Sequence, residues 1–237
     1  MEGVSTRKVK EVTRRAVRDL LLQEPRLFPG RLPRLGAGGL EGSRRLEAEA
    51  YPYVFVDASY EKVRVDHKVV NRGVLVVSGV RDDGFREVLG VGVADTESEA
   101  TYHQLFRSLK RRGLSGVQLV VSDDHEGLKA AIARHFQGAS HQRCQVHYAR
   151  NLLGMVGHAR RKELGTDLRA IFAAPDRKQA LTIAASVAEK WRQKGNEKVA
   201  EHLEEHIEEC LSCLAFPESH RRRIRTTNGL ERLRARR

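Results

Sequence analysis

The chain has 237 residues, a formal net charge of +12 and a pI near 10.0. Hydrophobic residues make up 40% of it, which suits a folded core and argues against a wholly disordered chain. It has neither an apolar run of ~18 residues that would cross a membrane nor the apolar core of a secretory signal. Three cysteines, an odd number, favour a reducing cytosol over a disulfide framework.

The positive charge is concentrated at the C-terminal end of the chain. Residues 216–237 contain eight arginines and two acids, which accounts for half of the net charge of +12. Charge clustered in this way indicates an anionic partner, most often a nucleic acid. The alternative is a basic surface that serves only solubility.

The N-terminal segment predicts one helix followed by irregular chain. Residues 5–22 place apolar side chains on one helical face, and Ser5 can cap that helix. Residues 25–42, rich in Pro, Gly and Arg, predict a loop or disordered linker. We therefore expect residues 1–50 to form a helix plus a degenerate linker.

Three strands are predicted next, at residues 51–60, 73–80 and 86–94. The first is rich in β-branched and aromatic side chains and is bounded by polar sequence. The Asp-Gly pair within residues 81–84 is a turn signal, so the second and third strands are expected to form a hairpin.

A helix is predicted between these strands and the next one. Thr96 and Glu99 match a capping box, and Gly113 would end the helix. The helix has a stripe of apolar residues at helical spacing. These are Tyr102, Leu105, Phe106 and Leu109.

The second half of the chain changes from alternating elements to helices. Residues 117–123 predict a buried strand, residues 125–136 a helix that Gly138 closes, and residues 140–147 a weaker strand. After Tyr148 every pattern is helical. The order of three strands, helix, strand, helix, strand and then helices predicts an α/β fold with a mixed sheet.

Two acids follow apolar strands and form the first candidate site. Asp57 ends the first predicted strand and Asp123 ends the fourth. If these strands are parallel neighbours, both carboxylates lie at one edge of the sheet. Carboxylates held together repel and require a cation, and hard oxygen ligands suit Mg²⁺ or Mn²⁺. The alternative is that Asp123 or Asp124 caps the following helix, which we favour for Asp124.

Five blocks of the sequence resemble, in the same order, the Mutator-type transposases of bacterial insertion sequences, which are DDE enzymes. These blocks are YPYVFVDASYEKVR (51–64), VRDDGFREVLGVGVADTESEA (80–100), VVSDDHEGLKAAI (120–132), HQRCQVHYARN (141–151) and FPESHRRRIRTTNGLERL (216–233). The resemblance implies an RNase H-like mixed sheet with an all-α helical insertion domain. It divides the chain into a core at 51–150, a helical insertion at 151–215 and a basic, Glu-bearing segment at 216–237.

The resemblance also implies a site and a reaction. The family's catalytic, metal-binding acids correspond to Asp57, to Asp123 at the end of VVSD, and to Glu231 in TTNGLER. The implied activity is metal-dependent DNA strand cleavage and strand transfer of an insertion sequence, with two Mg²⁺ or Mn²⁺ ions. The expected location is the bacterial cytoplasm, in association with the nucleoid.

The arginines before Glu231 are candidates for DNA binding. They would hold phosphates without reading the base sequence. They are Arg221, Arg222, Arg223 and Arg225. The expected partners are the DNA of the transposon ends and of the target; no membrane partner is expected, and a homodimer remains open.

Cysteine, histidine and tryptophan residues leave alternatives open. Cys144 and His147 match a family C-x-x-H signature beside the active site, and with Cys210 and Cys213 they could supply four zinc ligands. We favour instead hydrogen bonding by Cys144 and His147 that shapes the site, with Cys210 in the core, so zinc is not expected. Trp191 could stack on an unpaired base, but a core position on a helix face is the favoured interpretation.

The ends of the sequence predict a weak or inactive catalyst. Only six residues follow Glu231, and the N-terminal segment lacks the second helix that the family resemblance implies. We therefore expect the short C-terminal helix to impair catalysis. We expect the missing second helix to weaken sequence-specific binding to transposon ends. The alternatives are an inactive transposase remnant that only binds DNA, and a zinc-binding DNA module without catalysis.

Overall fold

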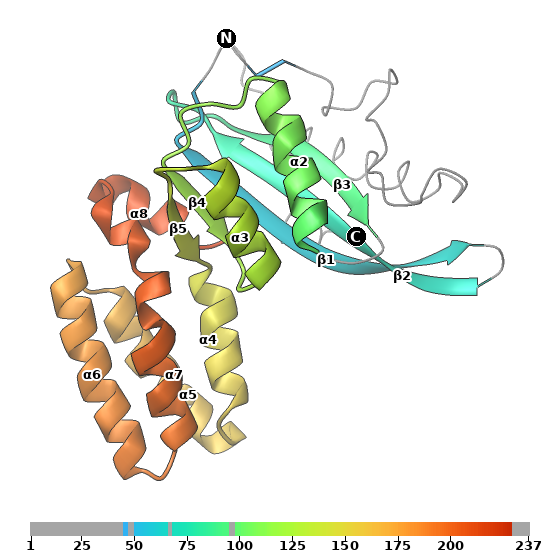
Figure 1. The fold of residues 1–237 in the computed structure, drawn as a ribbon. Coiled ribbons are helices and arrows are strands. Elements are labelled where there is room, and N and C mark those ends of the chain that lie inside the picture. The colour runs from blue at the N-terminus through green and yellow to red at the C-terminus, as the bar shows by residue number, and fades with distance from the viewer. Residues whose placement is uncertain (1–44, 47–49, 66–67, 95–97, 229–237) are drawn as a thin grey trace. The chain divides into compact units, whose positions relative to one another are not determined.

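The computed structural model describes residues 45–46, 50–65, 68–94 and 98–228 (Figure 1). The helix predicted at 5–22 and the linker predicted at 25–42 lie outside these residues. In the described part of the chain, no helix combines the length and the apolar character that a membrane span needs.

Three antiparallel strands confirm the first predicted strands and their hairpin. They are β1 (Tyr53–Val65), β2 (Lys68–Val80) and β3 (Arg86–Ala94). At the β2–β3 turn Gly84 has a φ of 81°, which a residue without a Cβ adopts at little cost. The strands β1 and β2 are longer than predicted, because they pair with each other along their whole lengths.

Among the described residues the sheet has five strands in the order β3-β2-β1-β4-β5, with β4 at Leu119–Ser122 and β5 at Ser140–Arg143. The N–H groups of Gln118 and Leu119 both donate to the carbonyl of Pro52 at 3.0 Å. The neighbours β1 and β4 therefore begin at the same end and run in the same direction. This mixed sheet, with its helices, confirms the predicted α/β class.

The chain divides into two compact units, and the division passes through β4. The first unit contains β1 to β3, the start of β4 and the helices α2 (Glu99–Arg111) and α3 (Glu126–His135). The second contains the end of β4, β5 and residues 140–227. Each unit has its own hydrophobic core.

In the first unit, α2 and α3 cover the sheet (Figure 1). The predicted stripe of α2 is buried in full, and Gly113, with a φ of 97°, follows the helix as predicted. The helix cap is Ser98, whose side chain accepts a hydrogen bond from the N–H of Thr101 at 3.2 Å. Thr96, which the predicted capping box places at the cap, lies outside the described residues.

The second unit is helical after β5. Its elements are α4 (Gln145–Gly154), α5 (His158–Phe172), α6 (Arg177–Gln193), α7 (Glu197–His206), the 3₁₀ turns η2 (Ile207–Cys210) and η3 (Ser212–Ala215), and α8 (Glu218–Ile224). The strand predicted at 140–147 ends at Arg143, because Tyr148 and Leu152 are buried four residues apart on the face of α4.

Trp191 lies in the core of this helical unit. Its side chain is 0% exposed, and its indole N–H donates to Asp167 Oδ2 at 2.8 Å. An enclosed indole offers no face to a nucleic acid base, so the base-stacking interpretation is wrong for this structure. The apolar helix face on which the sequence places Trp191 is a packing face.

Candidate functional site

Asp57 lies inside β1 and not at its end. It is opposite Val76 of β2, and only 4% of it is exposed. The sequence placed it at a strand end because it directly follows the apolar run VFV. Pairing with β2 carries the strand on to Val65.

Asp123 directly follows β4, as predicted, and its side chain is 50% exposed. Its Oδ1 accepts a hydrogen bond from the N–H of Asp124 at 2.8 Å. Its Oδ2 lies 3.5 Å from Nδ1 of His147. Two neighbours therefore restrict the orientation of a carboxylate that remains open to solvent.

Hydrogen bonds connect the residues around Asp123 to β5 and to the start of α4. The N–H of Cys144 donates to the carbonyl of Ser122 at 2.7 Å. The Ser122 hydroxyl donates to the carbonyl of Asp123 at 2.9 Å and lies 2.8 Å from Nε2 of His141. The sequence block 141–151 thus supports the turn that presents Asp123.

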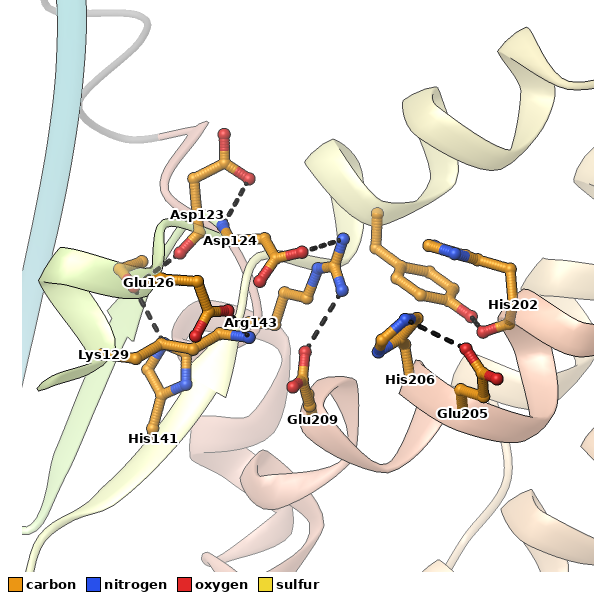
Figure 2. Close-up of polar contacts among 12 residues, drawn as sticks. Asp123, Asp124, Glu126, Lys129, His141, Arg143, His202, Glu205, His206 and Glu209 are labelled. Carbon is orange, nitrogen blue, oxygen red and sulfur yellow. Dashed lines mark hydrogen bonds and ion pairs between the residues drawn. The ribbon is translucent and has the colours of Figure 1, made fainter. Parts of the chain in front are cut away.

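Asp124 does not cap α3, so the favoured prediction for this residue is wrong. The cap is His125, whose Nδ1 accepts from the N–H of Leu128 at 3.3 Å. The carboxylate of Asp124 instead lies 2.7 Å from Nη2 of Arg143 (Figure 2). A buried guanidinium attracts a carboxylate more strongly than a helix N-terminus does.

Arg143 is the residue of this region that sequence reasoning missed. It is 1% exposed and also contacts Glu209, with 3.1 Å between Nη1 and Oε2. The carbon of its guanidinium lies 5.0 Å from the ring centre of Tyr148. The sequence feature that could have identified it is an arginine in a short predicted strand, immediately before the C-x-x-H pair Cys144 and His147.

Cys144 and His147 lie beside Asp123 in the second unit. The thiol sulfur of Cys144 accepts from the N–H and the hydroxyl of Thr227 at 3.4 and 3.5 Å. Burial by itself would raise the pKa of the Cys144 thiol, but hydrogen bonds from His147 and Thr227 outweigh it and lower that pKa. The hydrogen bonding predicted for this pair is therefore present, and its role in shaping the site stays a prediction.

Cys210 and Cys213 are buried in the second unit, where burial raises the pKa of Cys210 and raises that of Cys213 to about 11. Since zinc binds thiolates, this environment suits protonated core cysteines better than zinc ligands. Across residues 45–46, 50–65, 68–94 and 98–228, no three His, Cys, Asp or Glu residues are grouped to hold a metal. Glu231 lies outside these residues.

The four candidate DNA-binding arginines have different environments. Arg221 donates to the backbone carbonyls of Phe216 at 2.8 Å and Pro175 at 2.6 Å. Arg222 and Arg223 are exposed on α8, and Arg225 is partly buried at its end. Arg222 and Arg223 are therefore the side chains most accessible to a phosphate backbone, whereas Arg221 holds α8 to the rest of its unit.

Comparison with known proteins identifies the family. The family model described as "Transposase, Mutator family" matches residues 41–237. The transposase of insertion sequence element IS406 from Burkholderia multivorans is 40% identical over 237 residues, covering 98% of this chain and 60% of the relative. The transposase of ISRM5 from Rhizobium meliloti is 35% identical over 233 residues, covering 98% and 58%.

A further relative covers a shorter region. The transposase of IS1081 from Mycobacterium tuberculosis is 41% identical over 134 residues, covering 56% of this chain and 32% of the relative. The chain thus spans about 60% or less of the length of these relatives. Among solved structures, the Drosophila P element transposase strand transfer complex has a TM-score of 0.31 and 11% identity, covering 65% of this chain and 44% of that one. This similarity is too low to support a conclusion about fold or function.

Proposed function

Since the chain belongs to the Mutator family of transposases, we propose that it acts in DNA transposition as a metal-dependent DDE transposase that cleaves and transfers DNA strands. The observation that carries this proposal is Asp123, a half-exposed carboxylate held at the end of β4 by its neighbours. It stands in the VVSD block that carries the family resemblance.

An RNase H-like core with an all-α insertion is the fold that goes with this function. Three antiparallel strands are followed by β4 and β5, and β1 and β4 are neighbours in the sheet. Residues 145–224 then form helices. Asp57 lies four residues after the first residue of β1, and Asp123 lies four residues after the first residue of β4. The family resemblance is what assigns both acids to the metals.

The donor atoms suit divalent magnesium or manganese. Asp57, Asp123 and Glu231 would supply carboxylate oxygens, the hard ligands that these ions prefer. Bound ions of this kind activate a water or a DNA 3′-hydroxyl and stabilise the leaving oxygen. The chain's own part is to orient the ligands: the Asp124 N–H restrains Oδ1 of Asp123, while His147 faces Oδ2.

The direct test is cleavage of a labelled DNA end from a related insertion sequence. We expect strand cleavage with Mn²⁺ or Mg²⁺ and none with EDTA. DNA binding without cleavage under all metal conditions would favour the inactive remnant. Stoichiometric zinc in the purified protein, with no cleavage, would favour the zinc-binding module.

Charge reversal on α8 is expected to weaken DNA binding for all sequences alike. Arg222→Glu and Arg223→Glu would each remove a phosphate-binding cation, so each should lower the slope of log affinity against log salt by about 1. Titration of two unrelated duplexes at several salt concentrations measures this. Arg177→Glu, a reversal at an exposed arginine paired with Glu208, is the control. Loss of affinity for one duplex only would show that these arginines read bases.

A further inference from the structure

A buried cation, the guanidinium of Arg143, pairs with two carboxylates, and one of them belongs to the residue that follows Asp123. Arg143 is the last residue of β5 and is 1% exposed, and its guanidinium lies between the carboxylates of Asp124 and Glu209 (Figure 2). The two ion pairs use different nitrogens, Nη2 at 2.7 Å and Nη1 at 3.1 Å. Tyr148 packs against the same guanidinium.

The chemistry of this position requires arginine. A cation removed from water is tolerated only where anions and hydrogen bonds compensate it. The planar guanidinium presents donors in two fixed directions, so it can hold carboxylates from two separate segments. Lysine would bring a single point charge that can approach one of the two carboxylates closely. Arg143 thereby connects the turn after β4 to η2, whose Glu209 lies 66 residues after Arg143 in the sequence.

The turn held by Arg143 is the one that orients Asp123. The side chain of Asp124 contacts Arg143, and the backbone N–H of the same Asp124 donates to Oδ1 of Asp123 at 2.8 Å. Cys144, the next residue after Arg143, holds the carbonyl of Ser122 at 2.7 Å. Fixing the Asp124 side chain therefore limits how the Asp124 N–H, and with it the Asp123 carboxylate, can rotate.

We propose that Arg143 is a positioning residue for Asp123, acting through Asp124 and braced by Glu209. Being buried, Arg143 touches neither metal nor DNA; its effect reaches Asp123 through the turn. This inference rests on the proposed function, since it assigns Asp123 the role of metal ligand. Groups that orient metal ligands typically contribute 10–100-fold to metal affinity or activity.

The test measures Mn²⁺ affinity of the full chain directly, by the loss of the free-ion electron paramagnetic resonance signal. Arg143→Lys is expected to raise the Mn²⁺ dissociation constant by about 10–100-fold. Asp124→Ala, at a side chain that is 28% exposed and so easier to replace, is expected to do the same. The double variant should bind no more weakly than the weaker single one, because both changes break the same link.

Two matched variants separate positioning from a general loss of stability. Glu209→Gln removes the second carboxylate and keeps the Asp124 contact, so it should lower the melting temperature while changing the Mn²⁺ constant by less than about threefold. Arg192→Lys makes the same substitution at an arginine of this unit that pairs with Glu189, Glu197 and Glu204. It should leave the Mn²⁺ constant unchanged.

The outcomes distinguish the inference from the proposed function. If the unaltered chain shows no Mn²⁺ binding that depends on Asp123, the proposed function itself fails. If such binding exists but Arg143→Lys and Asp124→Ala leave it intact, the positioning role is wrong. The role is also wrong if Glu209→Gln weakens Mn²⁺ binding as much as Arg143→Lys does.

Discussion

Asp123→Asn is expected to abolish metal-dependent DNA cleavage, whereas Asp124→Asn is expected to lower its rate by only about tenfold. Asparagine is neutral and a far weaker ligand for a hard divalent ion than a carboxylate. Losing a metal ligand worth several kcal/mol of transition-state stabilisation would lower the rate by at least ~10³-fold. Asp57→Asn should behave like Asp123→Asn, since the same family resemblance assigns both acids to the metals.

The retained activity of Asp124→Asn follows from what that substitution leaves in place. The amide oxygen can still accept from Arg143, and the backbone N–H that restrains Asp123 is unchanged. We expect a loss of about tenfold, consistent with an indirect role. Single-turnover cleavage with Mn²⁺ at saturating protein measures both variants. Equal losses for Asp123→Asn and Asp124→Asn would show that the assignment of the catalytic acid is wrong.

Trp191→Ala is expected to destabilise the helical unit without a specific effect on DNA. Removing a fully buried aromatic side chain costs ~3–5 kcal/mol of unfolding free energy. The change also removes one donor from Asp167, which otherwise keeps contacts of 2.7 and 2.9 Å with Lys190. Trp191→Phe should cost less, because it keeps much of the apolar volume and loses mainly the hydrogen bond.

Urea unfolding followed by circular dichroism measures these changes in stability. Met155→Ala, at a side chain that is 43% exposed, serves as the control and should stay within ~0.5 kcal/mol of the unaltered chain. DNA affinity, measured at a temperature where each variant remains folded, should differ little among the three. A Trp191→Ala variant with normal stability but weakened binding to single-stranded DNA would restore the base-stacking interpretation.

Local patterns in the sequence were sufficient for most of the elements. The Asp-Gly pair in residues 81–84 predicted the β2–β3 hairpin, and four apolar residues at helical spacing predicted the buried face of α2. The apolar run before Asp123 predicted β4 and the position of that acid after it. Such signals succeed because turn geometry and side-chain periodicity depend on residues close together in the chain. The ordered blocks that resemble Mutator transposases indicated the family.

Contacts between distant segments decided what the sequence could not. Pairing with β2 placed Asp57 inside a strand, although the apolar run before it had suggested that it ends a strand. Asp124 pairs with the guanidinium of Arg143 and does not cap α3. The second partner of Arg143, Glu209, is 66 residues away from it in the sequence. Local propensity favours Asp as a helix cap. Leaving a buried cation without a counter-charge costs more free energy than losing a helix cap. Only the tertiary structure shows where that cation is buried.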